Sequence, residues 1–222
     1  MTLARENQPT REDLYAFFMG RRWRGDLYCP DASRAALRTA VDYGLGLQKS
    51  TGKPFVWLCC TNRGVETINK VAIDLLGLDD ARKGNGYPTD PNAGESLRFY
   101  AHPGVYVRLT RNVDKDRGFV NGATGVVKRV LSCEDGIPNV FTVELSTGVH
   151  VLVHPVRHNK KLFLPCTYGY ATTIRKAQGA TYDHGAIWFD HCYPPERGYG
   201  YVAASRFRKK AGIYLVRQGP PH

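Results

Sequence analysis

Hydrophobic and polar positions follow two different periods along the first third of the chain. Apolar residues at helical spacing predict helices over about residues 10–23 and 35–43. The apolar run FVWLCC (55–60) is typical of a strand buried on both faces, as the strands of a parallel sheet are. Helical spacing returns over residues 65–76, and Gly77 marks the end of that helix. A strand, a polar turn and a helix in this order form half of an α/β unit.

The pattern changes in the middle of the chain. Residues 79–98 are rich in Gly, Pro, Asn and Asp, which predicts a long exposed loop. Several short strands are predicted next, in the segments GVYVRLT, GATGVVKRVL, NVFTVEL and GVHVLVHPV. Because no helix is predicted between them, these evenly spaced strands favour a small antiparallel β-barrel.

After Pro165 the α/β pattern returns. The predicted elements are a helix over TTIRKAQ, a strand at AIWFD, a helix over YVAASRFRKKA that ends at Gly212, and a strand at IYLVR. The simplest architecture is one α/β domain with a parallel sheet, made of residues 1–98 and 161–222 and interrupted by the barrel at 99–160.

The positive charge of the chain indicates a class of binding partner, which the pattern of elements alone does not. The chain has 31 Lys and Arg against 20 Asp and Glu, a formal net charge of +11, and the excess grows toward the carboxyl terminus. A balance this basic is typical of proteins that bind a polyanion, and nucleic acid is the first candidate. The alternative is a basic surface that only keeps the protein soluble.

The sequence predicts an intracellular protein without membrane contact. No apolar run approaches the roughly 18 residues of a membrane span. The opening MTLARENQPTRED has no apolar core and contains acids, unlike a secretory signal. These features do not distinguish the nucleus from the mitochondrion.

Cysteine and histidine give no metal-site pattern. The six cysteines include no CxxC pair, and Cys59 and Cys60 end an apolar run, where we expect them in the core. His150, His154 and His158 recur every four residues. Their segment predicts a strand, however, in which four residues separate side chains by roughly 13 Å. We therefore expect no metal site.

Four segments carry the candidate chemistry. They are LCCTNRGVETIN, GVYVRLTRNVDKDRGFVNGATGVV, YATTIRKAQGAT and YVAASRFRKKAGIYL. In this order they resemble the Pif and RecD branch of superfamily-one DNA helicases. The third resembles that family's motif V, A-x-T-I-H-K-x-Q-G-x-T, and the fourth resembles motif VI, Y-V-A-x-S-R-x-R. The resemblance implies the second RecA-like domain of such a motor, of the P-loop NTPase type, with an inserted Src-homology-like barrel.

Five residues are candidates for binding single-stranded DNA. Thr61 and Asn62 follow a predicted strand at a helix start, where unpaired amides bind phosphate oxygens; the alternative is a simple N-cap. Thr173, Arg175 and Lys176 supply a hydroxyl and two cations suited to backbone contacts; the alternative is a solvated basic helix face. The family usually has histidine at the position of Arg175, which leaves open whether ATP turnover is coupled to DNA.

Three residues are candidates for the nucleotide site. By the resemblance, Gln178 and Gly179 lie close to the nucleotide; the alternative is an ordinary helix stop. Arg206 matches the motif VI arginine, which reaches the γ-phosphate across the domain cleft and offsets the charge of the transferring phosphoryl group. We take it as the catalytic residue. The alternative is a surface ion pair with a carboxylate.

This chain contains no phosphate-binding loop of the form G-x-x-x-x-G-K-[ST]. The nearest match, from Gly46 to Pro54, has the wrong spacing and ends on proline. No predicted strand ends in an Asp-Glu pair that would hold Mg²⁺. We therefore expect the carboxyl-terminal half of an ATP-dependent DNA helicase, with 5′ to 3′ polarity implied by the family. ATP and Mg²⁺ would be bound mainly by the missing first RecA-like domain. We therefore expect the chain alone to be inactive.

Two other functions fit the same residues. One is a non-catalytic module that binds single-stranded nucleic acid and derives from a helicase. The other is an unrelated basic α/β protein that binds RNA. A P-loop encoded in frame upstream of Met1 would favour the motor, for which the resemblance implies roles in DNA repair and recombination.

Overall fold

A computed structural model of the chain describes residues 34–94, 96–190 and 198–216. The helix predicted over residues 10–23 lies outside these residues. Two compact units are present: one combines the residues up to Val65 with those from Thr172 onward, and the other is Glu66–Ala171. The domain boundaries drawn from the sequence at residues 98 and 161 stay a prediction.

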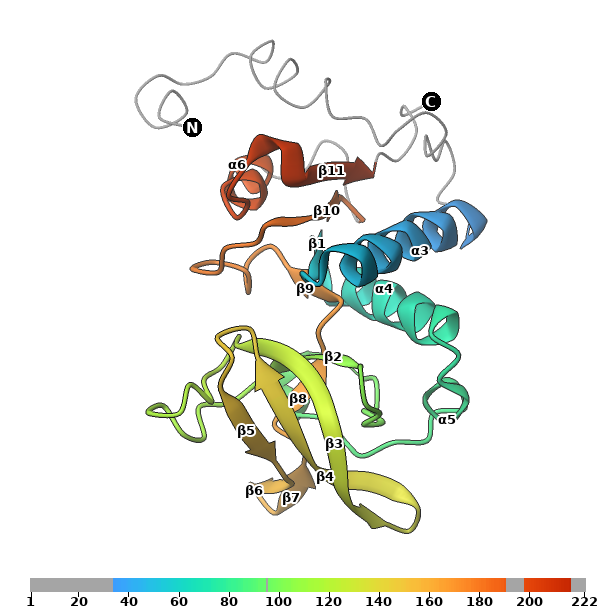
Figure 1. Ribbon diagram of the computed structural model, residues 1–222, viewed down its shortest axis with the longest axis vertical. Helices are drawn as coiled ribbons and strands as arrows, with labels where there is room; N and C mark the ends of the chain where they lie inside the picture. The colour runs from blue at the N-terminus through green and yellow to red at the C-terminus, as the bar shows by residue number, and fades with distance from the viewer. Residues whose placement is uncertain (1–33, 95, 191–197, 217–222) are drawn as a thin grey trace. The chain divides into compact units, whose positions relative to one another are not determined.

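The first unit contains a parallel sheet (Figure 1). Its strands are β1 (Phe55–Cys59), β9 (Ala171–Thr173), β10 (His184–Trp188) and β11 (Ile213–Val216), in the order β11-β10-β1-β9. Strand β10 pairs in parallel with both β1 and β11. All five residues of β1 are buried, which confirms the prediction from the apolar run FVWLCC.

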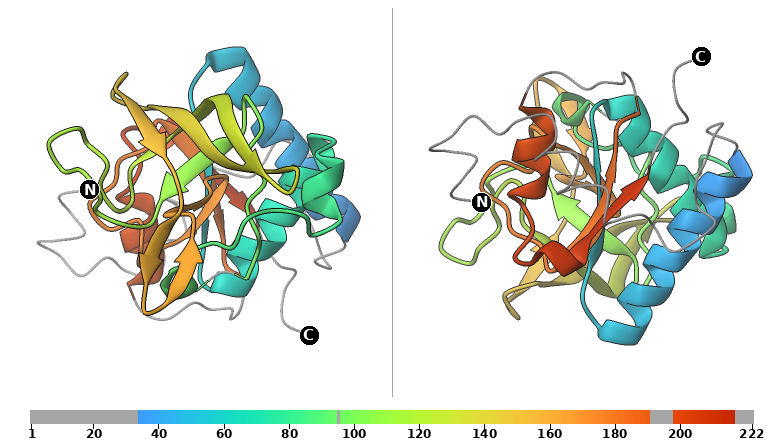
Figure 2. Two further views of the ribbon diagram at one scale, coloured as in Figure 1. Left: turned by 90° about the horizontal axis from the view of Figure 1, so that it is seen from below. Right: turned by 90° about the horizontal axis from the view of Figure 1, so that it is seen from above.

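One helix lies beside these strands, and a second follows β1 along the chain. Helix α3 (Arg34–Thr51) buries Leu37, Ala40 and Val41 at the i, i+3, i+4 spacing of one helical face. It lies beside β11 (Figure 2, right), where the rings of Tyr43 and Tyr214 meet edge to face with centroids 5.8 Å apart. Helix α4 (Asn62–Leu75) follows β1, as predicted, and Gly77 adopts a left-handed conformation just after its end.

The second unit contains an antiparallel sheet with the order β5-β4-β3-β2-β8. These strands are β2 (Tyr106–Leu109), β3 (Thr124–Glu134), β4 (Ile137–Leu145), β5 (His150–Val153) and β8 (Cys166–Tyr168). A separate hairpin joins β6 (Val156–His158) to β7 (Lys161–Phe163). The rings of Phe99, Phe141 and Tyr168 meet in the core. The predicted α/β class is confirmed: a parallel sheet is present, and a separate antiparallel sheet lies where the sequence predicted a small barrel.

The helix predicted over TTIRKAQ is wrong. Thr172 and Thr173 end strand β9, and residues 174–179 form turns. The reason is a long-range contact, since the backbone N–H of Ile174 donates to Cys59 O at 2.9 Å and so continues the sheet. Residues with β-branched side chains also pack well in strands.

The helix predicted over YVAASRFRKKA is too long. Helix α6 spans Tyr199–Ala204, and a 3-10 turn, η2, spans Lys210–Gly212. Between them the backbone pairs with a distant segment instead of continuing the helix. Tyr182 N donates to Arg206 O at 2.8 Å, and Arg208 N donates to Tyr182 O at 3.0 Å.

The loop predicted over residues 79–98 is only partly exposed. It contains the short helix α5 (Asp79–Arg82) and the 3-10 turn η1 (Pro91–Ala93). Asp90 is buried, because its carboxylate accepts hydrogen bonds from the Arg111 guanidinium and the Asn92 amide. The predicted strand character of the histidine segment is confirmed in β5 and β6. Within the described residues, no helix is long and apolar enough to cross a membrane.

Candidate functional site

The carboxyl ends of three strands meet at one edge of the parallel sheet. Strands β1 and β10 end side by side, at Cys59 and Trp188. Ile174, the residue after β9, is hydrogen-bonded to Cys59 O. Ligands of open parallel sheets bind outside this edge. Thr61 and Asn62 follow β1 at this edge, Thr173 is the last residue of β9, and Arg175 and Lys176 lie in the turn after it.

Thr61 caps helix α4 and is held by a carboxylate. Its Oγ1 accepts a hydrogen bond from Gly64 N at 3.0 Å, the geometry of an N-cap. The same hydroxyl donates to Asp190, which follows β10. Asp190 Oδ1 also accepts from the amides of Cys60 at 2.6 Å and Thr61 at 3.2 Å. The N-cap interpretation of Thr61 is therefore confirmed, and a protein carboxylate takes the amides expected to meet phosphate.

Gly64 makes room for this carboxylate. A Cβ atom at residue 64 would lie 2.2 Å from Asp190 Oδ2, well inside van der Waals contact. Sequence reasoning missed both Asp190 and Gly64. A polar residue directly after an apolar strand was the available signal for Asp190, because the ends of parallel strands gather at one edge.

Asn62 and Lys176 are brought together from segments far apart in the sequence. Lys176 Nζ donates to Asn62 Oδ1 at 3.2 Å. The Lys176 amide in turn donates to Thr173 Oγ1 at 3.3 Å, which shapes the turn after β9. An ammonium, an amide and a hydroxyl therefore lie within one chain of contacts at the carboxyl edge. This group, Asn62, Thr173 and Lys176, is called the carboxyl-edge cluster below.

Arg175 lies beside the first residue of helix α6. Its guanidinium carbon is 5.7 Å from the ring centroid of Tyr199, a cation–π distance. Both Arg175 and Lys176 are exposed. Tyr199 is a further residue that the sequence analysis missed, since it lies 24 positions along the chain and outside the recognised motif V segment.

Gln178 and Gly179 close the turn that follows β9. Gly179 has φ +87, the left-handed region that favours glycine, and a Cβ there would meet nothing within 4 Å. The Gln178 side chain is exposed. The backbone of this turn is therefore open to close approach, and the alternative of a helix stop is wrong because no helix precedes it.

Arg206 follows helix α6 and contacts neutral groups. One terminal Nη donates to Ser205 Oγ at 2.8 Å, and Nε lies 3.2 Å from the same hydroxyl and 3.3 Å from Val202 O. Among the described residues it makes no ion pair, so the alternative of a surface ion pair is not what this part of the chain shows. A half-buried guanidinium without a carboxylate keeps its charge for another anion.

The candidate residues form two groups and not one. The hydrogen bond from Tyr182 to Arg206 places Arg206 beside the segment that enters β10, at the amino end of that strand. The carboxyl-edge cluster lies at the opposite end of the sheet. Helix α6 joins the two, with Tyr199 at its start and Arg206 two residues beyond its end.

No family model matches the chain. Over 126 residues it is 32% identical to the ATP-dependent DNA helicase PIF1 of Xenopus laevis. Over 122 residues it is 46% identical to the ATP-dependent DNA helicase Pif1 of Bdellovibrio bacteriovorus. Each match covers 53% of this chain, but 19% and 27% of the respective relative.

The fold is similar to two crystal structures of Pif1 from Bacteroides. One is a complex with ADP-AlF3 and ssDNA, with TM-score 0.60 and 23% identity over 97% of this chain and 47% of that chain. The other is bound to ssDNA, with TM-score 0.52 and 26% identity over 73% of this chain and 40% of that chain. This chain therefore spans less than half the length of each of these proteins.

Proposed function

Because a region of this chain is homologous to the Pif1 family of DNA helicases, we propose that the chain is the carboxyl-terminal half of an ATP-dependent DNA helicase. In this role it binds single-stranded DNA at the carboxyl edge of its parallel sheet. It also supplies Arg206 to an ATP site that a second RecA-like domain completes. The homology removes the alternative of an unrelated basic α/β protein that binds RNA.

The carboxyl-edge cluster is the observation that carries DNA binding. The Lys176 ammonium is held at the sheet edge by Asn62 and by the turn that Thr173 shapes. Arg175 adds a second cation, oriented over the Tyr199 ring. Cations held in place bind phosphate without reading base sequence. Thr61 supports the same edge as the N-cap of α4, and its own contact with DNA stays part of the proposal.

Arg206 is the residue that carries nucleotide chemistry. Within the described residues, its guanidinium contacts a hydroxyl and a carbonyl, which leave its charge uncompensated and therefore fit a phosphate group. The open backbone at Gly179 offers an approach for the nucleotide. Bound ATP supplies the phosphoryl group, and Mg²⁺ would be held by the other domain. Arg206 then offsets the charge that develops on the γ-phosphoryl oxygens during transfer.

DNA binding is tested with the chain itself. We expect Lys176→Ala to weaken binding of a labelled oligo-dT about fivefold to tenfold in fluorescence anisotropy, and to reduce the log-log salt slope by about 0.7. Lys49→Ala removes the same charge from the exposed end of α3 and is the matched control, expected within about twofold of wild type. Equal losses for the two variants would place the DNA site elsewhere.

Catalysis is tested after joining the chain to a matching first RecA-like domain. We expect Arg206→Ala to lower the DNA-stimulated ATPase rate constant by about 10³ to 10⁵ with nearly normal DNA affinity. Arg206→Lys restores only part of the rate, because a point charge lacks the planar fork. A loss below about fivefold would remove Arg206 from the active site. We expect the chain alone to show no turnover.

A non-catalytic module that binds single-stranded nucleic acid is the second candidate. It is favoured by the fact that the carboxyl-edge cluster is complete within this chain and needs no nucleotide. DNA-stimulated ATPase turnover by the chain joined to the first domain would rule out a non-catalytic module. Polarity of 5′ to 3′, an intracellular location, and roles in DNA repair and recombination rest on the family resemblance and belong to the helicase proposal.

A further inference from the structure

The β6–β7 hairpin carries a cluster of basic side chains at its tip. Arg157, His158, Lys160 and Lys161 are all exposed and lie within five consecutive positions. Strand pairing sets Arg157 opposite Leu162 and His158 opposite Lys161. None of the four is ion-paired within the part of the chain that the structure describes. These four residues are called the hairpin tip.

The turn at this tip holds a lysine in an unfavourable conformation. Asn159 has φ +47 and Lys160 has φ +62, the pair of left-handed residues of a two-residue type I′ turn. Glycine is preferred at the second position, because a Cβ atom disfavours the left-handed region. The β3–β4 hairpin of the same unit follows this preference, with Asp135 at φ +51 and Gly136 at φ +76.

That contrast within one unit indicates a role for the Lys160 side chain. Residues held in sparsely populated conformations cluster at functional sites, where another requirement outweighs the conformational cost. At an exposed turn, the packing of a buried core supplies no such requirement. The feature that lysine adds over glycine here is a mobile positive charge projected from the end of a hairpin.

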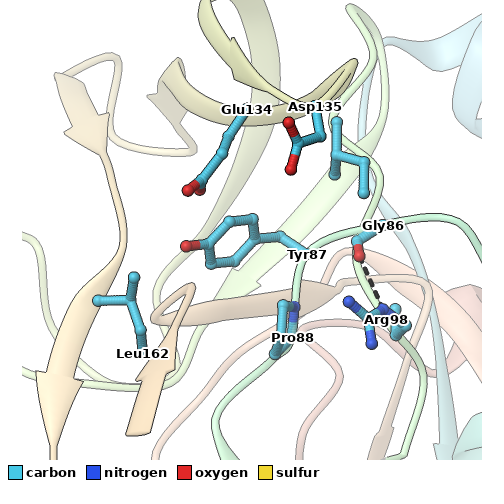
Figure 3. Close-up of a pocket in the computed structure, with 8 residues that line it drawn as sticks. Gly86, Tyr87, Pro88, Arg98, Glu134, Asp135 and Leu162 are labelled. Atoms are coloured by element: carbon cyan, nitrogen blue, oxygen red, sulfur yellow. Dashed lines mark hydrogen bonds between the residues drawn. The ribbon is translucent and has the colours of Figure 1, made fainter.

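The two faces of the hairpin differ in charge. Leu162 lines a pocket together with Tyr87, Glu134 and Asp135 (Figure 3). Burial and the Glu134 carboxylate raise the pKa of Tyr87, which marks this side as acidic. Cross-strand partners share a face, so Arg157 lies on the acidic side with Leu162, whereas His158 and Lys161 lie on the other face. The basic side chains of His158 and Lys161 therefore face away from the acids.

We propose that the hairpin tip binds the phosphate backbone of nucleic acid, at a site separate from the carboxyl-edge cluster. The proposal deepens the proposed DNA-binding function and rests on it for the identity of the polyanion. Long cations on a projecting hairpin suit a repeating line of phosphates, whose contacts need charge and not shape. Single-stranded and duplex DNA share this chemistry, and the experiment separates them.

Lys160→Gly should affect stability and DNA affinity in different directions. Glycine relieves the left-handed conformation, so the melting temperature should stay the same or rise. The same change removes a phosphate contact. We therefore expect the affinity for DNA at low salt to fall about threefold to tenfold and the log-log salt slope to fall by about 0.9 on duplex or 0.7 on single strands. A structural role for Lys160 would give a lower melting temperature with unchanged binding.

The measurement is anisotropy titration of the full chain with oligo-dT and with a blunt duplex of the same length, at several salt concentrations. Lys161→Ala should behave like Lys160→Gly in binding, and Lys83→Ala, which removes an exposed cation elsewhere in the unit, should stay within about twofold of wild type. Weaker binding of either DNA form supports the proposal, and the form that is affected shows whether the tip binds single-stranded or duplex DNA. Unchanged binding of both, or an equal loss for Lys83→Ala, overturns it.

Two further arms separate this inference from the proposed function. If Lys176→Ala weakens binding while Lys160→Gly does not, the carboxyl-edge cluster stands and the hairpin tip fails. If Lys160→Gly weakens the binding of polyglutamate as much as it weakens the binding of DNA, the tip attracts any acidic polymer, including an acidic peptide, and the nucleic-acid assignment is overturned.

Discussion

Gly64 and Asp190 fit together so closely that any Cβ at residue 64 would lie 2.2 Å from Asp190 Oδ2. The pair joins the first turn of α4 to the second residue after β10. Asp190 uses the space to accept hydrogen bonds from the backbone of the β1–α4 turn. Asp190 therefore sets the position of Asn62, the residue directly after Thr61, although it lies about 130 positions away in the sequence.

Gly64→Ala should destabilise the chain, although alanine is the better helix former. Alanine in a helix normally stabilises by about 0.5–1 kcal/mol relative to glycine. Here the clash with Asp190 should outweigh that gain and lower the free energy of unfolding by about 1–3 kcal/mol in urea denaturation. The control is Gly46→Ala in α3, where a Cβ meets nothing within 4 Å. It should stabilise the chain.

Removing the carboxylate should reverse the effect of this substitution. In an Asp190→Ala background, Gly64→Ala should become neutral or stabilising, because the clash is gone. Asp190→Ala alone should destabilise, since the Cys60 and Thr61 amides lose their acceptor. If Gly64→Ala costs the same in both backgrounds, the two residues do not interact.

Acid should weaken the second unit through Asp90. Burial alone would raise the pKa of this carboxyl, but hydrogen bonds from Arg111 and the Asn92 amide hold it below its ordinary value of 3.8. A depressed folded pKa contributes stability that is present above the unfolded pKa and is lost as pH falls through the folded value. Urea midpoints should show wild type and Asp90→Asn converging as pH drops below about 3.9. A constant gap would contradict this.

Arg206→Ala should leave the fold nearly intact. The arginine donates to Ser205 Oγ and Val202 O, neutral partners whose hydrogen bonds contribute about 0.5–1.5 kcal/mol each. A thermal melt should therefore shift by no more than about 6 °C. Arg111→Ala, which strips a buried carboxylate of its partner, is the comparison and should destabilise more. A larger shift for Arg206→Ala would assign it a structural role.

Tyr199 should influence DNA affinity without contacting DNA. Its ring orients Arg175 at 5.7 Å, an interaction worth about 0.5–1 kcal/mol at an exposed site. Tyr199→Leu should therefore weaken oligo-dT binding about twofold to fivefold, whereas Tyr199→Phe, which keeps an aromatic face, should bind like wild type. Equal affinities for the two variants would show that the ring plays no part.

Local pattern predicted the elements whose stability is local. The strand FVWLC and helix α4 follow from the period of their apolar residues, and both are present. The antiparallel strands of the second unit follow from their turns in the same way. In each case, side-chain burial on one face or two agrees with backbone preference, so neighbouring residues carry enough information.

The site could be predicted only in part, because its contacts are long-range. Motif resemblance placed Asn62 and Lys176 in the same group, and the structure joins them with a hydrogen bond. No local pattern indicated that the Ile174 amide would donate to Cys59 O. This contact continues the sheet where the sequence predicted a helix. Asp190 was missed for the same reason, since its partners Cys60 and Thr61 lie about 130 positions away in the turn after β1.

The length of helix α6 matters as much as the residues that it contains. It has six residues, fewer than two turns, from Tyr199 to Ala204. Each added residue would advance the following backbone by about 1.5 Å and rotate it by about 100°. An insertion here would turn Arg206 away from Tyr182 even if every side chain were kept. Natural variants of this segment should therefore tolerate exchanges on its surface far better than insertions or deletions.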